Sequence, residues 1–248
     1  MKTIVIGDIH AHPHWEEIIN REGFRDRDDM RAVFLGDYVS THERYTPWEQ
    51  VAELMDILEF KQEWGDRVIL LRGNHDIQHL GFYWAQCSGY FPDVAAAMAE
   101  EDFKERFLRL TQWTFRDGDI LYSHAGVSNR WMKDNNIQSI NDINDMPCSE
   151  RFAFCPDSPL DYSGDSVTQP PVWIRPMSLI GDLQQNKGWP DGIRIQVVGH
   201  TPVSRIAAVP VKIESTGKTF YVACCDNLPK GYAVIDSGSD PWLEYKTL

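Results

Sequence analysis

The sequence predicts a mixed α/β (α+β) fold, with parallel strands and helices near the N-terminus and further strands near the C-terminus. Three apolar, β-branched runs in the first third alternate with segments of helical periodicity, an order typical of parallel strands joined by right-handed crossovers. The last quarter holds further strand patterns and predicts a second, largely antiparallel sheet. With 248 residues, 42% of them hydrophobic, the chain can bury one substantial core. We therefore expect a single domain over residues 1–248.

The first third contains the clearest elements. Strands are expected at residues 3–6, 32–35 and 68–71, and a short helix at residues 15–21. A longer helix should begin after Thr46, because Thr46, Pro47 and Glu49 have the spacing of a capping box with proline at the first helical position. This helix should end near Gly65.

The remainder of the chain is less periodic. One helical pattern covers residues 93–112, and residues 113–122, broken by Asp117 and Gly118, predict a hairpin. Residues 130–191 are rich in Asn, Asp, Pro and Ser, and we expect a long irregular excursion over the site. Strands are expected again at residues 193–198, 206–209, 219–224 and 232–235.

Charge and cysteine content restrict the function. The formal net charge is −13, which disfavours non-specific binding to nucleic acid or anionic membranes. No apolar stretch approaches the length of a membrane span, and the N-terminal residues 1–6 read as a strand and not as a signal peptide. The five cysteines are odd in number and lack CxxC spacing, which indicates reduced thiols in a cytoplasmic protein.

Five short segments place an Asp, Asn or His beside a glycine or within two residues of one. They are Gly7-Asp8-Ile9-His10, Gly36-Asp37-Tyr38, Gly73-Asn74-His75-Asp76, Ser123-His124-Ala125-Gly126 and Gly199-His200-Thr201-Pro202. Any one of them could be an ordinary turn. The first three follow predicted parallel strands, whose carboxyl ends are where α/β sheets bind ligands. Together the five supply oxygen and imidazole donors for a pair of divalent ions that cleaves phosphate.

These motifs resemble the calcineurin-like metallophosphoesterase superfamily, from residue 7 to about residue 202. Within it they are most similar to the PPP-type phosphatases, which include Ser/Thr protein phosphatases, the lambda-phage-type phosphatase and the bacterial diadenosine tetraphosphatase. The resemblance implies a β-sandwich of two mixed sheets flanked by helices. It also implies two divalent metal ions, with manganese the first choice and iron or zinc the alternatives.

The resemblance assigns a metal-binding role to six residues. Asp8 and His10 would bind the first metal, Asp37 would bridge both, and Asn74, His124 and His200 would complete the coordination of the second metal. With Asp37 shared, the first metal then receives three protein ligands and the second four, and both keep open positions for water and phosphate, as a catalytic site requires.

The other histidines lack motif support. We expect His12 and His14 at the rim or surface, and structural roles for His42 and His79. Pro202 stands where nuclease-like members of the superfamily carry the second histidine of a Gly-His-x-His element. This departure favours the phosphatase branch over nucleases.

The resemblance further implies attack by a metal-bridging hydroxide, with His75 as the general acid that protonates the leaving oxygen. Two positions depart from the family. Ser40 replaces the carboxylate that usually orients this histidine, and Thr41 replaces a phosphate-binding arginine. Arg175, in a Trp-x-Arg segment, is the first candidate to bind phosphate, and Arg44 is a possible substitute.

Three functions remain open. The first is hydrolysis of phosphate monoesters on a phosphorylated protein or small molecule. The second is hydrolysis of a dinucleoside polyphosphate. The third is a non-catalytic interaction protein that keeps the fold, which the complete ligand set and His75 make the weakest reading. We expect no membrane partner, and the acidic charge disfavours nucleic acid as a partner.

Overall fold

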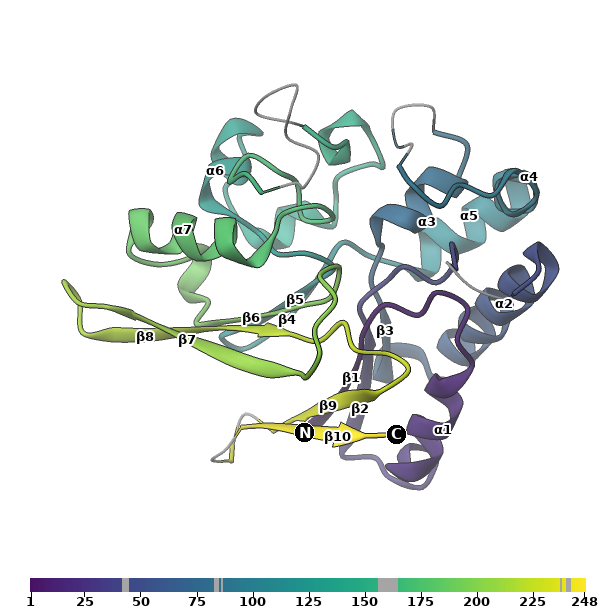
Figure 1. Cartoon of the computed structure of the whole chain (residues 1–248), viewed down its shortest axis with the longest axis horizontal. Helices are drawn as coiled ribbons and strands as arrows, with labels where there is room; N and C mark the ends of the chain where they lie inside the picture. Colours follow the sequence, from purple (N-terminus) through teal and green to yellow (C-terminus); the bar gives the residue numbers. More distant parts are fainter. Residues whose placement is uncertain (42–44, 83–84, 86, 156–164, 237, 240–241) are drawn as a thin grey trace.

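The computed structural model describes residues 1–41, 45–82, 85, 87–155, 165–236, 238–239 and 242–248. Two five-stranded sheets lie face to face, with helices on the outer face of each (Figure 1). The strand orders are β10-β9-β1-β2-β3 in the first sheet and β4-β5-β6-β8-β7 in the second. Both sheets are mixed, so the expected sandwich of two mixed sheets is confirmed.

The first sheet contains the predicted N-terminal strands. β1 (Lys2–Ile6), β2 (Met30–Phe34) and β3 (Val68–Leu70) run parallel, with α1 (His14–Arg21) and α2 (Pro47–Trp64) between them. The predicted capping box at Thr46 begins α2. The same sheet also contains β9 (Gly231–Ile235), antiparallel to β1, and β10 (Leu243–Thr247), which the sequence did not predict.

The second sheet begins with the predicted hairpin, β4 (Thr114–Asp117) and β5 (Ile120–Ser123). β6 (Ile195–Val198) is parallel to β5 and to β8 (Lys218–Cys224), whereas β7 (Ala207–Ile213) is antiparallel to β8. The prediction of a separate, largely antiparallel sheet in the last quarter is therefore wrong. Strands of that quarter join both sheets, because a strand's partner is chosen by tertiary packing and not by its own pattern.

Two apolar layers hold the sheets in place. Successive strand residues point to opposite faces, so Val5 and Val33 pack in the layer between the sheets, whereas Ile4 and Ile6 pack under the helices. All four side chains are fully buried. The sandwich thus fixes the strand ends that carry the motifs.

The helical segments differ from the prediction in one place. The single helix expected over residues 93–112 is two helices, α4 (Pro92–Ala99) and α5 (Glu101–Leu110), because Glu100 has a non-helical ψ of 132°. The short α3 (Asn74–His79) was not predicted.

The described part of the predicted excursion contains helices of its own. They are α6 (Asn129–Asp134) and α7 (Pro176–Asn186), with 3-10 turns at Ile140–Ile143, Glu150–Phe152 and Pro190–Gly192. Two more 3-10 turns lie at Phe24–Asp26 and Gly65–Arg67. Within the ranges given above, no helix is long and apolar enough to cross a membrane.

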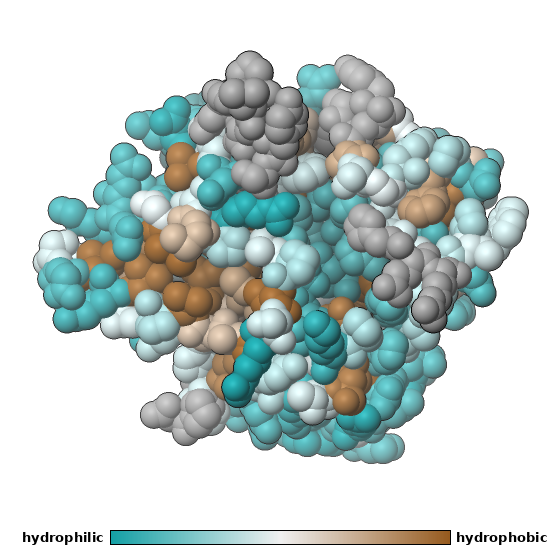
Figure 2. Space-filling model, in the orientation of Figure 1, coloured by the Kyte–Doolittle hydropathy of each residue, from teal (hydrophilic) through white to brown (hydrophobic). Residues whose placement is uncertain are grey.

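The five motifs meet at one edge of the sandwich. Each follows a strand, and β1, β2 and β3 are parallel, as are β5 and β6, so their carboxyl ends share an edge. Backbone hydrogen bonds join the motif loops: the His10 amide donates to the Asp37 carbonyl at 2.7 Å, and the Gly199 amide to the His124 carbonyl at 2.8 Å. On this face of the molecule a hydrophilic recess lies between the two halves (Figure 2).

Candidate metal centre

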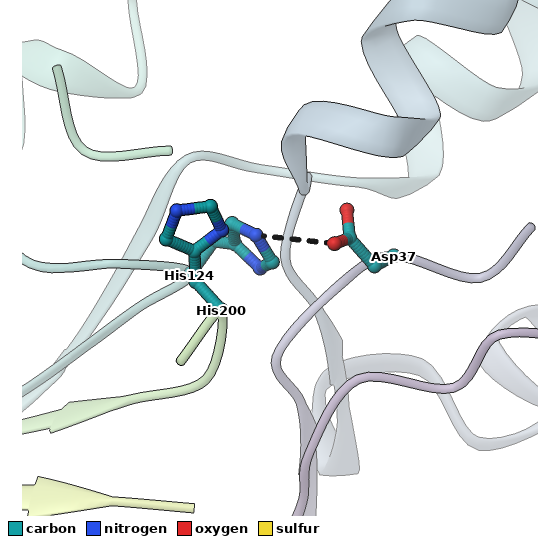
Figure 3. A group of neighbouring side chains, drawn as sticks. All are labelled: Asp37, His124 and His200. Atoms are coloured by element: carbon teal, nitrogen blue, oxygen red, sulfur yellow. Dashed lines mark ion pairs between the residues drawn. The ribbon is translucent and has the colours of Figure 1, made fainter. Parts of the chain in front are cut away.

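The predicted ligands converge in two groups that share one carboxylate. Ligand atoms of Asp8, His10 and Asp37 lie within 4.8 Å of one another, and so do those of Asp37, His124 and His200. Figure 3 shows the second group, with both imidazoles beside Asp37. Asp37 therefore occupies the place that a bridging ligand needs.

Asp8 is held by the backbone of another motif. Its carboxylate is 3% exposed and accepts the His200 amide at 2.9 Å and 3.1 Å. This contact is close because Gly199 has no side chain: a Cβ there would lie 2.2 Å from Asp8 Oδ1. The glycine thus makes room for a ligand, and not only for a turn.

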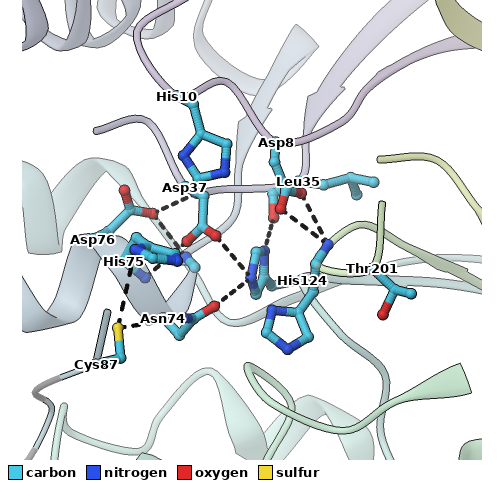
Figure 4. A network of polar contacts seen from close by, with 12 residues as sticks. Asp8, His10, Leu35, Asp37, Asn74, His75, Asp76, Cys87, His124 and Thr201 are labelled. Carbon is cyan, nitrogen blue, oxygen red and sulfur yellow. Dashed lines mark hydrogen bonds and ion pairs between the residues drawn. The ribbon is translucent and has the colours of Figure 1, made fainter. Parts of the chain in front are cut away.

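Asp37 is positioned in the same way. Its Oδ1 accepts the His75 amide at 2.9 Å, and a Cβ at Gly73 would lie 2.0 Å from that oxygen. Asp76, which the sequence did not single out, holds the loops together (Figure 4). Its carboxylate accepts the backbone amides of Asp37 at 2.9 Å, Tyr38 at 2.7 Å and Gly73 at 2.8 Å.

Three ligands have left-handed backbone conformations. The φ angles are 45° at His10, 52° at Asp37 and 59° at His200. Such conformations cost non-glycine residues about 1–3 kcal/mol each and cluster at functional sites. The three strained backbone positions therefore accompany the side chains that meet in the two ligand groups.

His124 has the orientation of a metal ligand. Its Nδ1 donates to the Leu35 carbonyl at 2.7 Å, so the lone pair is on Nε2. Nε2 faces two further acceptors, Asn74 Oδ1 at 3.0 Å and Asp37 Oδ2 at 3.4 Å. Burial lowers the pKa of His124, which favours this neutral form. Acceptors that face one another in a buried site fit a cation between them.

His200 gives a second, independent indication that this site suits a cation. Its Nε2 is buried and has no hydrogen-bond partner among the residues that the structure describes. Burial, with His124 nearby, holds the pKa of His200 well below its usual value. A buried imidazole nitrogen without a proton or partner is costly unless an ion binds it.

The carboxylates in this region also repel one another. Burial raises the pKa of Asp8 well above its usual value, and Asp226 and Asp37 add to the effect. Asp226, which follows β8, was missed by the sequence analysis; burial and Asp37 raise its pKa to about 7. Burial opposes ionisation of Asp37, but His124 and other imidazoles lower its pKa to about 2. Divalent cations would relieve this repulsion.

Gln78, not Ser40, contacts the predicted acid. The Gln78 amide is fixed, since its Oε1 accepts the Cys87 amide at 3.0 Å and its Nε2 donates to the Ser88 carbonyl at 3.2 Å. The same Nε2 lies 3.1 Å from His75 Nδ1 and can only donate, which places the ring proton on Nε2. The sequence analysis missed Gln78 because this residue lies one helical turn from His75 in α3, a helix that was not predicted.

Ser40 is bonded elsewhere. Its Oγ donates to the Gly89 carbonyl at 2.6 Å, and its amide donates to Gln50 Oε1 at 2.9 Å. The Thr41 amide donates to the same Gln50 oxygen at 3.4 Å. Arg44 and His42 lie outside the described residues.

Arg175 lies beside the second ligand group. The guanidinium is half-buried, and its Nη1 donates to the His200 carbonyl at 3.0 Å and to Thr201 Oγ1 at 3.1 Å. Arg72, by contrast, donates to the carbonyls of Leu108 and Thr111 and is structural.

The remaining histidines belong to neither ligand group. His79 is buried, with its Nδ1 donating to the His75 carbonyl at 2.7 Å and its Nε2 accepting the Phe91 amide at 3.0 Å. This is the structural role that we expected. The rings of His12 and His14 are partly exposed and 5.7 Å apart. All five cysteines are free thiols, as predicted.

A shared aspartate between two sets of imidazole and carboxylate donors defines a candidate dinuclear metal centre. Its place at the strand ends of a two-sheet sandwich agrees with the comparison with known families, in which the calcineurin-like phosphoesterase profile matches residues 1–204. The chain belongs to the calcineurin-like phosphoesterase family.

Part of the chain is also similar to a curated relative. The symmetrical bis(5′-nucleosyl)-tetraphosphatase of Chromohalobacter salexigens is 28% identical over 137 residues, which cover 53% of this chain and 47% of that protein. The match thus spans about half the length of that relative.

Solved structures share the fold over the whole chain. A cold-active protein-tyrosine phosphatase of a psychrophilic Shewanella has a TM-score of 0.61 and 17% identity, with 80% of that chain covered. A metallophosphoesterase from Sphaerobacter thermophilus has a TM-score of 0.54, 15% identity and 88% coverage. A serine/threonine phosphatase from Saccharomyces cerevisiae has a TM-score of 0.53, 17% identity and 79% coverage. Each matches 100% of the present chain.

Proposed function

We propose that the protein is a dinuclear metal-dependent phosphatase that hydrolyses phosphate monoesters on a phosphorylated protein or small molecule. The observation that carries this proposal is the pair of ligand groups joined by Asp37. Such a pair suits a phosphate, whose attacking and leaving oxygens can each be stabilised by one ion.

Asp8, His10 and Asp37 would hold one ion, and Asp37, Asn74, His124 and His200 the other. When bound, the ions supply a nucleophilic water at neutral pH and neutralise phosphate charge. The mixed oxygen and imidazole donors suit manganese, our first choice, and also iron or zinc.

The protein's own groups would do the rest. Gln78 at Nδ1 directs the Nε2–H of the neutral His75 ring towards the leaving oxygen. As the general acid, His75 would take up a proton at Nδ1 in place of the Gln78 contact and give its Nε2 proton to that oxygen, which leaves a neutral ring. Arg175, anchored at Thr201, would bind a phosphate oxygen, because a guanidinium matches phosphate geometry. Arg44 remains a second candidate for that role.

The alternative substrate is a dinucleoside polyphosphate. The partial match to a bis(5′-nucleosyl)-tetraphosphatase favours it. A non-catalytic role is the weakest reading, because the ligand donors are all present and brought together. A cytoplasmic location, with no membrane or nucleic-acid partner, also remains our proposal from the sequence.

The test is a panel of initial rates with manganese-loaded protein. Phosphopeptides, small monoesters, diadenosine tetraphosphate and single-stranded DNA are compared at equal concentration. We expect monoester hydrolysis to exceed DNA cleavage at least about a hundredfold, or roughly 2.7 kcal/mol in barrier. A higher kcat/KM for diadenosine tetraphosphate than for every monoester would select the alternative, and DNA cleavage at the monoester rate would refute the phosphatase proposal.

A further inference from the structure

An apolar hollow of about 510 Å³ lies beside Arg175. This volume falls in the range of ligand pockets, about 300–1,000 Å³. Its walls come from the start of α7, the loop after β6 and the end of β8; the residues that matter are Pro176, Met177, Val203 and Cys224, with Arg175 and Thr201.

The hollow adjoins the candidate metal centre through one shared wall. Arg175 and Thr201 line it, and the same arginine donates to the carbonyl of the ligand His200 at 3.0 Å. Thr201 lies directly beside the ligand cluster in Figure 4. A phosphate bound at Arg175 would therefore have this hollow as a neighbour.

The walls of the hollow include an apolar side chain that is exposed to solvent and does not belong to the core. Met177 is 70% exposed although it is a large apolar side chain at the start of α7. On the same face, apolar surface lies below α7, beside the hydrophilic recess (Figure 2). A contiguous apolar patch with polar residues at its rim often marks a ligand-binding site.

The negative charges near the hollow favour a neutral group over a second phosphate. Asp165 stands in the lining, with its Oδ1 accepting from Ser178 Oγ at 2.7 Å. The buried Asp226 also interacts with Arg175. These carboxylates would repel a further phosphate group, whereas a neutral ring would bury apolar surface against Met177 and Val203.

We infer that the hollow is a subsite for a flat ring joined to the phosphate, such as the aryl group of an aryl phosphate or the base of a nucleotide. This inference rests on the proposed function, because it requires a phosphate beside Arg175. The ring would contact Met177 and Val203 in the lining of the hollow, with its phosphate at Arg175.

The test compares phosphonates, which bind but are not hydrolysed. Calorimetry with manganese-loaded protein measures methylphosphonate, phenylphosphonate and a nucleoside 5′-phosphonate. We expect each ring compound to bind about fivefold more tightly than methylphosphonate, as when roughly 40 Å² of ring leaves water. Of the two ring compounds, the one with the larger gain in affinity over methylphosphonate shows whether the subsite prefers an aryl group or a nucleoside.

Two matched variants locate the effect. Met177→Glu should abolish the ring's gain and leave methylphosphonate binding within about twofold. Val209→Glu, a control at an apolar residue that is 45% exposed on β7 outside the hollow, should preserve the gain. Equal affinity for all three phosphonates, or a gain that survives Met177→Glu, would overturn the inference.

The two proposals fail separately. Ester hydrolysis without a ring gain would refute the subsite and keep the phosphatase. A ring gain that depends on Met177, without hydrolysis of any ester in the panel, would keep the subsite and refute the phosphatase.

Discussion

Replacing Gly199 with alanine should disable the first metal position while leaving the fold intact. The added Cβ would lie 2.2 Å from Asp8 Oδ1, so the carboxylate must retreat by at least about 1.2 Å to reach ordinary van der Waals contact. That movement also stretches the bonds from the His200 amide, now 2.9 Å and 3.1 Å. A displacement of this size at a catalytic centre can cost about 10²-fold in rate.

The assay combines elemental analysis, thermal unfolding and initial rates on a monoester. We expect Gly199→Ala to hold fewer than two ions and to lose about 10²-fold in kcat. Gly181→Ala is the matched control: a Cβ there meets no atom within 4 Å, and alanine in α7 should add about 0.5–1 kcal/mol of stability. Two tightly held ions and wild-type kcat in Gly199→Ala would refute the reasoning.

Four further outcomes are expected. Asp37→Asn should abolish activity and bring metal content from about two ions towards one or none, because the shared carboxylate is lost; elemental analysis measures this. Gln78→Leu should lower kcat about 3–10-fold on alkyl phosphates and less on nitrophenyl phosphate, since one hydrogen bond that orients His75 is removed; paired substrates check it. Ser40→Asp should destabilise the protein by about 1–3 kcal/mol in urea unfolding, because a buried donor to a backbone carbonyl becomes a carboxylate. The Tm gain on adding manganese should grow from about pH 4 to pH 7, because burial raises the pKa of Asp8 and, with Asp37, raises that of Asp226 to about 7. The folded metal-free protein keeps protons that the unfolded chain releases, so metal-free stability falls as pH rises through this window.

These outcomes have distinct contradictions. Two bound ions in Asp37→Asn would exclude it as the bridge, and equal losses on both substrates in Gln78→Leu would mean that it does not act through His75. A Ser40→Asp variant as stable as wild type would contradict the bond to the Gly89 carbonyl. A Tm gain that is constant with pH would contradict the charge repulsion described above.

Local signals predicted the N-terminal half of the fold well. The strands near residues 3–6, 32–35 and 68–71 are uniform apolar runs, and Thr46 marks the start of α2 unambiguously. The break at Glu100 was missed, because no glycine or proline interrupts the helical pattern there. The pairing of β9 with β1 was missed because it joins residues more than 200 positions apart, and β10, which pairs with the nearby β9, was not predicted as a strand.

The ligands were predictable for a different reason. Each belongs to a short glycine-containing segment at a strand end, and the structure shows that Gly73 and Gly199 leave room for the carboxylates of Asp37 and Asp8. Asp226 lacks such a signal, since nothing in its sequence neighbourhood indicates that it lies near Asp37. Residues that act through another side chain are visible only when the fold brings them together.

The central claim is that two ions share Asp37, and anomalous diffraction from manganese-loaded crystals tests it most directly. We predict two manganese peaks, one contacting Asp8, His10 and Asp37 and the other contacting Asp37, Asn74, His124 and His200. A single peak, or two peaks that do not share Asp37, would contradict the account.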